Sequence, residues 1–185
     1  MVDNDLNVTK EDVSISFSKL HLLSFPVVVI AVLCLSVPFI MIYGKDDFVA
    51  GFHSFIRLRS YFPVLIIGMV VHELIHGLSW SLLANKNMSA IRYGISKKTL
   101  TPYAHCKEPI SARAYKIGAL LPGIIMGVIP GIIAIIIGNS WLLMFGNLFT
   151  LLAAGDFVIV ALLWKVKDNR QVEDHPSRAG CYIYN

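Results

Sequence analysis

The chain has 185 residues, of which 56% are hydrophobic and only 15% are charged, and its mean hydropathy is +0.66. Globular proteins carry roughly 25% charged residues, so this composition excludes a disordered chain and disfavours an ordinary soluble domain. The net charge of +4 is compatible with nucleic-acid binding, but the basic residues are distributed as in a membrane protein, and no nucleic-acid partner is expected. The length predicts a single domain over residues 1–185.

Four long apolar runs dominate the sequence, at residues 22–43, 61–84, 117–137 and 141–164. Each reaches the roughly 17 to 25 residues that a helix needs to cross a bilayer, and the alternation of barrel strands is absent. Hydrocarbon offers the backbone no hydrogen-bonding partner, so spans of this kind must be helical. The first run is too long for a cleaved signal peptide. We therefore expect an all-α polytopic membrane protein with four transmembrane helices.

The connections between the runs differ in character. Residues 44–60 are long enough for a short interfacial helix, and Gly138, Asn139 and Ser140 predict a tight turn between the last two spans. In the loop over residues 85–116, the stretches 91–95 and 99–103 predict a small β-hairpin in which Pro102 confines the second strand to an edge. Residues 165–185 form a tail.

The basic residues predict the orientation of the chain in the membrane. All but three of the 16 Lys and Arg residues fall in the N-terminal segment, the loop and the tail, the exceptions being Lys45, Arg57 and Arg59. Lys and Arg collect on cytoplasmic segments. We expect a multi-pass protein of the cytoplasmic membrane with both termini and the loop in the cytoplasm.

The second span contains the sequence His72-Glu73-Leu74-Ile75-His76. A carboxylate at the centre of a membrane helix costs roughly 2.5 to 3.5 kcal/mol, so this cluster indicates a function. On a helix the two histidines lie about 40° apart on one face, where both imidazoles can reach one ion, and Glu73 is directed to the side. This is the H-E-x-x-H arrangement, in which His72 and His76 are two metal ligands and the carboxylate of Glu73 lies beside the bound water.

A catalytic zinc site needs a third protein ligand, and we expect it to be Asp156. Asp156 is the acidic residue of the fourth span, and both it and His76 lie eight residues from the predicted cytoplasmic ends of their spans. Both therefore lie about 12 Å below the same face. Asn147 of the same span is nine residues away and is interpreted as a helix-packing amide.

The loop residues His105 and Cys106 are a secondary possibility for ligands. Adjacent residues of an extended segment point in opposite directions, so at most one of them would face the metal. A solvated histidine and a buried or free thiol are the favoured interpretations.

Several segments together carry a family resemblance: the His72–Gly77 motif, Tyr103-Ala104-His105-Cys106, Leu121-Pro122, Gly155-Asp156 and Asp174-His175-Pro176-Ser177. With these the chain resembles the putative zincin peptidases, small bacterial membrane proteins similar in plan to site-2-type intramembrane metalloproteases. The resemblance implies Zn²⁺ held by His72, His76 and Asp156, with Glu73 as the base. It departs from the site-2 pattern, because no proline lies between Asn147 and Asp156 and Phe157 follows the aspartate.

The expected function is hydrolysis of peptide bonds by a zinc-activated water at the HExxH site. The expected partners are the lipid bilayer and a peptide or membrane-protein substrate, and the oligomeric state is left open. Two alternatives remain at this stage. The chain is then either a catalytically inactive metal-binding membrane scaffold or an ion carrier whose buried His, Glu and Asp residues form a transport site.

Overall fold

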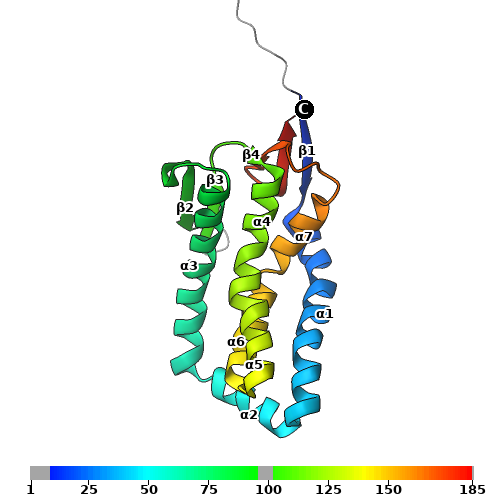
Figure 1. The fold of residues 1–185 in the computed structure, drawn as a ribbon, viewed down its shortest axis with the longest axis vertical. Coiled ribbons are helices and arrows are strands. Elements are labelled where there is room, and N and C mark those ends of the chain that lie inside the picture. The colour runs from blue at the N-terminus through cyan, green and yellow to red at the C-terminus, as the bar shows by residue number, and fades with distance from the viewer. Residues whose placement is uncertain (1–8, 96–101, 185) are drawn as a thin grey trace, which may run out of the picture.

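The structure, a computed structural model, describes residues 9–95 and 102–184, and in it the long helices run side by side with small β-sheets at one end (Figure 1). The helices are α1 (Phe17–Tyr43), α2 (Lys45–Phe55), α3 (Leu58–Leu83), α4 (Ala112–Pro122), α5 (Ile129–Ile137), α6 (Ser140–Leu152) and α7 (Ala154–Leu162). A short 3₁₀ helix, η1 (Met88–Ala90), precedes the β2 strand, and a π-helix, η2 (Gly123–Val128), joins α4 to α5.

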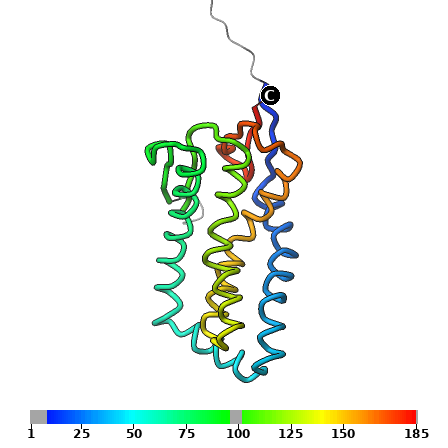
Figure 2. Tube along the Cα trace, viewed as in Figure 1, coloured from blue at the N-terminus to red at the C-terminus, as the bar shows by residue number. Residues whose placement is uncertain are grey.

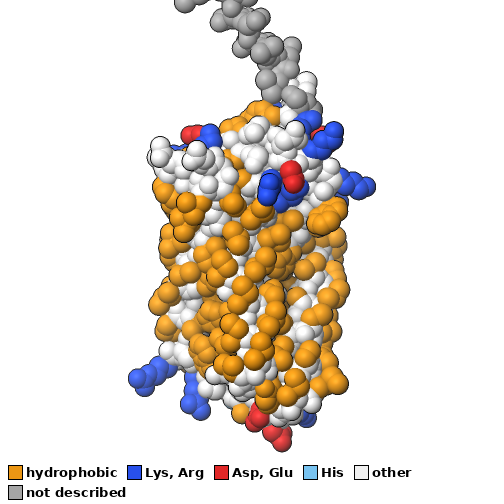
Figure 3. Space-filling model, in the orientation of Figure 1, with side chains coloured by type: hydrophobic (Ala, Val, Ile, Leu, Met, Phe, Trp, Pro, Cys, Tyr) orange, Lys and Arg blue, Asp and Glu red, His pale blue; other side chains and the backbone are white. Residues whose placement is uncertain are grey.

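Three helical segments are long and apolar enough to cross a membrane: Phe17–Tyr43, Leu58–Leu83 and Ala112–Ile137, the last made of α4, η2 and α5. The α6 and α7 helices together form a fourth apolar segment that is bent by 42° at its break. Large hydrophobic side chains are exposed along these helices and form a broad apolar belt (Figure 3). The four predicted runs thus correspond to helices, and the fourth is broken instead of straight.

Local sequence explains where several helices begin and end. Ser16 caps α1 by accepting a hydrogen bond from the Lys19 amide, and Ser111 caps α4 in the same way. Gly138 ends α5 with a φ of 69°, a left-handed conformation that glycine adopts without strain. The Asn139 side chain then caps α6, so the predicted tight turn is present.

The chain also contains two small antiparallel sheets. The two-stranded sheet is made of β2 (Ile91–Ile95) and β3 (Pro102–Cys106), and the four-stranded sheet has the order β1-β6-β5-β4. Its strands are β1 (Lys10–Ile15), β4 (Ile110–Ser111), β5 (Gln171–Asp174) and β6 (Ala179–Tyr184). The fold is therefore mostly helical, as expected, but the tail and the N-terminal segment form a sheet that the all-α prediction did not include.

The predicted hairpin is present with a shifted second strand. Its first strand matches β2, whereas the second extends from Pro102 to Cys106; residues 99–101 of the predicted strand lie outside the described residues. In the register of the hairpin, Tyr93 lies opposite Ala104 and Gly94 lies opposite Tyr103. Tyr93 and Tyr103 therefore point to opposite faces.

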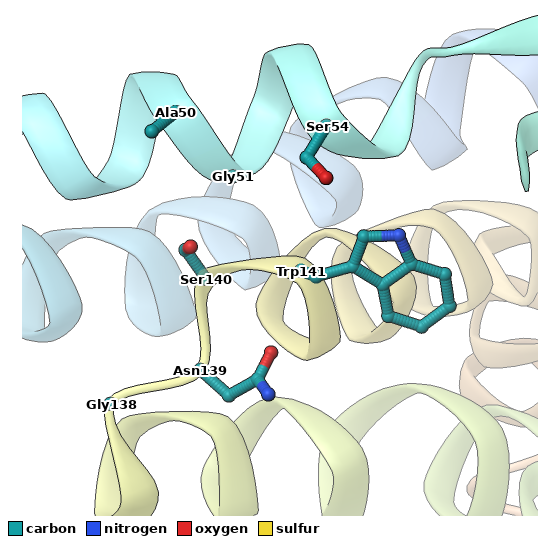
Figure 4. Close-up of a pocket in the computed structure, with 7 residues that line it drawn as sticks. All are labelled: Ala50, Gly51, Ser54, Gly138, Asn139, Ser140 and Trp141. Atoms are coloured by element: carbon teal, nitrogen blue, oxygen red, sulfur yellow. The ribbon is translucent and has the colours of Figure 1, made fainter.

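The path of the chain brings the two sheets together. From the four-stranded sheet, α1 runs to the far end of the molecule, α2 lies across that end, and α3 returns to the sheets (Figure 2). At the far end, Gly51 of α2 packs against Ser140 beside a shallow pocket of about 380 Å³ (Figure 4). This pocket is lined by neutral residues, and the residues with candidate chemistry lie on other elements.

Beneath the sheets lies a core that includes Trp80, Tyr115 and Leu163 together with Cys106 and Cys181. Burial, followed by the charges of Asp174 and Asp12, raises the pKa of the Cys181 thiol to about 12. Burial also raises the pKa of Cys106. Both thiols are therefore protonated near neutral pH and inaccessible to reagents.

We expect both cysteines to resist alkylation in the folded protein. In a Cys34→Ser background, which removes the exposed cysteine of α1, maleimide at pH 7.5 should label Cys106 and Cys181 more than about 100-fold more slowly than in denaturant. Mass spectrometry of the time course measures both rates. Equal rates with and without denaturant would contradict the packing of this core.

Candidate metal centre

His72 and His76 lie one turn apart on the buried face of α3. Their Nε2 atoms are 3.2 Å apart. The Nδ1–H group of His76 donates to the carbonyl oxygen of Gly118 on α4, at 2.9 Å, which leaves Nε2 as the unprotonated nitrogen facing His72. The imidazole of His76 also stacks on Trp80, with ring centroids 5.2 Å apart. The orientation of His76 is thus set from two sides.

Asp156 reaches the same point from α7. Its Oδ2 atom lies 3.2 Å from Nε2 of His72 and 3.5 Å from Nε2 of His76. The bend at Ala153 places Asp156 in the first turn of a new helix, and Gly123 of the π-helix packs against Ala153, where a Cβ atom would approach to 2.7 Å. The break in the fourth span and the π-helix of the third are therefore packed together beside Asp156.

The three ligand atoms fit a tetrahedral zinc ion. His72, His76 and Asp156 each offer one ligand atom, and these atoms all lie within 4.8 Å of one another. Zinc bound to nitrogen or oxygen at about 2.0 to 2.1 Å separates neighbouring ligand atoms by about 3.3 to 3.4 Å. The observed separations of 3.2, 3.2 and 3.5 Å match this spacing. Two imidazoles and one carboxylate are also a common donor set for catalytic zinc, and one that suits iron as well.

Glu73 lies beside this cluster and is held by the hairpin. Its Oε2 atom accepts a hydrogen bond of 2.7 Å from the backbone N–H of Ala104 on β3. In the described part of the chain, the second carboxylate oxygen, Oε1, makes no hydrogen bond. The glutamate of the motif is thus fixed by a strand from the predicted cytoplasmic loop.

Tyr93 lies near the candidate site, and the sequence did not indicate this position. Its hydroxyl group packs directly over Gly77, where a Cβ atom would approach to 2.1 Å, so this close contact requires glycine. Gly77 lies one turn beyond Glu73 on the same face of α3. Burial and the negative charge of nearby Glu73 raise the pKa of Tyr93. Tyr93 thus brings a protonated hydroxyl to the side of the cluster where Glu73 lies.

His105 and Cys106 do not join the cluster. The Nδ1 atom of His105 lies 3.3 Å from Oδ2 of Asp174, and the same oxygen accepts a hydrogen bond of 3.1 Å from the Cys106 amide. The other oxygen of Asp174 accepts a hydrogen bond of 2.6 Å from the Tyr115 hydroxyl. Asp174 therefore ties the tail to β3 and α4, and β3 in turn holds Glu73.

The remaining predicted polar residue also has a structural partner. The side-chain amide of Asn147 donates to the Ser36 hydroxyl of α1, at 3.0 Å, so Asn147 connects two helices as expected. The structure thus brings His72, His76 and Asp156 together with Glu73 beside them and leaves His105, Cys106 and Asn147 elsewhere. Little in the sequence indicated that Tyr93 and Ala104 lie near Glu73. The alternation of apolar residues predicted the first strand of the hairpin, but it did not indicate which face of the hairpin contacts α3.

Fold and site together define a class of protein: a mostly helical chain with membrane-length helices and a candidate three-ligand metal centre next to a glutamate. A family model described as putative zincin peptidase matches residues 65–170, more than half of the chain. The protein belongs to this family, and the matched segment contains all three candidate ligands and Glu73. No curated protein and no solved structure matches the chain.

Proposed function

We propose that this protein is a zinc metallopeptidase of the cytoplasmic membrane that hydrolyses peptide bonds at its HExxH motif. The observation that carries the proposal is the convergence of His72, His76 and Asp156, from two helices, on one point with Glu73 beside it. Membership in the zincin peptidase family supports both the metal and the reaction.

The charge distribution supports the proposed orientation in the membrane. The described ends of the chain, β1 and β6, lie together at the sheet end of the molecule, and the basic residues Lys45, Arg57 and Arg59 lie on or beside α2 and the start of α3 at the other end (Figure 1). Because most Lys and Arg residues belong to the segments at the sheet end, that end is assigned to the cytoplasm. An apolar belt lies between the two ends (Figure 3).

In this proposal His72, His76 and Asp156 hold the zinc ion. Zinc, when bound, supplies Lewis-acid chemistry: it lowers the pKa of a coordinated water and polarises the scissile carbonyl group. Gly118 contributes by accepting the Nδ1 proton of His76, which keeps Nε2 available as a ligand atom.

Glu73 performs the proton transfers. Oε2 remains bonded to Ala104, so Oε1 takes the proton from the attacking water and afterwards delivers it to the nitrogen of the departing amine. The hydrogen bond to Ala104 keeps the carboxylate from turning away. The base therefore depends on the position of β3 as well as on α3.

In this proposal the hydroxyl group of Tyr93 binds the substrate by donating a hydrogen bond to the carbonyl oxygen of the scissile peptide. We expect Tyr93→Phe to lower kcat by roughly 10- to 100-fold, with little change in zinc content, because a hydrogen bond to the developing oxyanion is lost. Cleavage kinetics and elemental analysis of the purified variant measure both. Tyr103→Phe, on the opposite face of the same hairpin, is the matched control and should behave as wild type. Equal losses in the two variants would remove Tyr93 from the mechanism.

The direct test of the function uses the purified chain in lipid nanodiscs. Elemental analysis measures the metal content, and mass spectrometry follows the cleavage of a peptide library and of candidate membrane proteins. One zinc per chain together with peptide products that disappear after chelation is the expected result. A chain that contains zinc and cleaves nothing would favour the inactive scaffold.

A further inference from the structure

A groove lies between α4 and α7 at the sheet end of these helices, with a volume of about 380 Å³. Its upper wall is polar and is formed by Arg113, Lys116 and Asp168. Its lower wall is apolar and includes Ile117, Leu120 and Trp164. We call it the α4–α7 groove.

The order of these residues along α4 gives the groove a polar and an apolar end. Arg113 lies in the first turn of the helix, followed by Lys116 and then by Ile117 and Leu120, at spacings that keep them on one face. Trp164 lies two residues beyond the end of α7 and is exposed. The groove therefore crosses the level at which the apolar helices meet the polar end of the molecule, where tryptophan is favoured in membrane proteins. Charged side chains lie above the apolar belt in this region (Figure 3).

The two basic side chains of the polar wall, Lys116 and Arg113, differ in their ion pairs. The ammonium group of Lys116 bonds to Oδ1 of Asp168 at 2.6 Å and to the carbonyl oxygen of Val166 at 3.1 Å, so these two opposite charges neutralise each other. The backbone N–H of Arg113 donates a hydrogen bond to the Asp168 carbonyl at 3.1 Å, and the Arg113 charge, after the hydrogen bond and charge of Lys116, helps to lower the pKa of the Asp168 carboxyl group. Within residues 9–95 and 102–184, the Arg113 guanidinium has no ion pair or hydrogen bond. The polar wall thus carries one net positive charge.

We infer that the α4–α7 groove binds one anionic phospholipid. A guanidinium group can bind a phosphate with two parallel hydrogen bonds, and Arg113 is free to do so. The acyl chain lies along Ile117, Leu120 and Trp164. A zwitterionic headgroup gains less, because its ammonium group would need Asp168, which Lys116 already occupies. The inference rests on the membrane location given in the proposed function, but not on peptidase activity.

Native mass spectrometry of the detergent-purified chain tests this inference. The protein is titrated with phosphatidylglycerol, phosphatidylethanolamine and phosphatidylcholine, and the first bound lipid is quantified. We expect phosphatidylglycerol to bind most tightly, Arg113→Gln to weaken its binding by about fivefold, and Arg113→Lys to retain part of the affinity. Arg57→Gln is the matched control, since it removes one exposed cation at the opposite end of the molecule and should change nothing.

The position of the bound lipid in the α4–α7 groove is tested with brominated phosphatidylglycerol in nanodiscs. Bromine quenches nearby tryptophan, so the quenched part of the fluorescence should decrease in both Trp164→Phe and Arg113→Gln. Soluble glycerol phosphate should not compete, which distinguishes a lipid site from a phosphate site. Equal binding of the three lipids, tighter binding of phosphatidylethanolamine, or equal effects of Arg113→Gln and Arg57→Gln would overturn the inference. A chain that binds phosphatidylglycerol in this way but cleaves no peptide would refute only the proposed function.

Discussion

Glu73→Gln is expected to abolish peptide hydrolysis, by at least about 100-fold and up to 10⁴-fold, while the chain keeps its zinc. Glutamine has nearly the same shape, and its amide oxygen can still accept the hydrogen bond from Ala104, so the β3 strand stays in place. What it loses is the ability to accept a proton. Product formation measured by mass spectrometry, together with zinc content, tests this expectation.

Glu108→Gln is the matched control for this substitution. Glu108 is an exposed glutamate whose Oε2 atom lies 2.7 Å from the Nζ atom of Lys86, and it has no part in the proposed mechanism. The Glu108→Gln variant should therefore retain full activity. Equal activity of wild type and Glu73→Gln would remove Glu73 as the base. Loss of zinc in Glu73→Gln would instead indicate that this carboxylate helps to hold the metal.

Replacement of any single ligand is expected to empty the metal site. In His72→Ala, His76→Ala and Asp156→Ala the zinc content should decrease from about one ion per chain to almost none. Removal of a residue that only hydrogen-bonds to a metal ligand typically lowers the affinity for the metal by about 10- to 100-fold. Removal of the ligand itself should therefore lower this affinity further. Elemental analysis after dialysis against a weak chelator measures this, and it also identifies the metal, since two histidines and one carboxylate suit iron too.

His105→Ala is the control for the ligand variants, because His105 is a histidine of the same region that faces Asp174. It should keep the full amount of zinc. Removal of the metal from wild type should also lower Tm, because a ligand that binds only the folded state stabilises it. Retention of zinc by all three ligand variants would refute the metal centre, and loss of zinc in His105→Ala alone would assign the site to the loop.

The membrane-length helices could be predicted because their signal is local. The predicted runs 22–43 and 61–84 agree within a few residues with α1 and α3, since apolar composition and length decide both. The break in the fourth span could not be predicted in this way. No proline lies near Ala153, and the bend accompanies the close packing of Gly123 against it, a contact between residues far apart in the sequence.

The four-stranded sheet was not predicted, because it too depends on contacts between residues far apart in the sequence. Strand β1 pairs with β6 in a register that places Lys10 opposite Tyr184, so this one pair of strands comes from the two ends of the chain. Strand β6 pairs with the preceding strand β5 as a local hairpin, but nothing near β1 in the sequence indicates that it pairs with a strand at the other end of the chain. The convergence of the three candidate ligands was easier to predict, because His72 and His76 are one turn apart and Asp156 lies at the same depth in its apolar run. Tyr93 was missed because its role depends on how the hairpin docks on α3.

The bend at Ala153 also changes the electrostatic environment of Asp156. Because α7 begins at Ala154, Asp156 occupies the first turn of a helix, where the aligned peptide dipoles favour a negative charge. In an unbroken helix the same carboxylate would lie at mid-helix, away from this positive dipole end. The break therefore stabilises the ionised form of Asp156 at the point where it meets the two histidines.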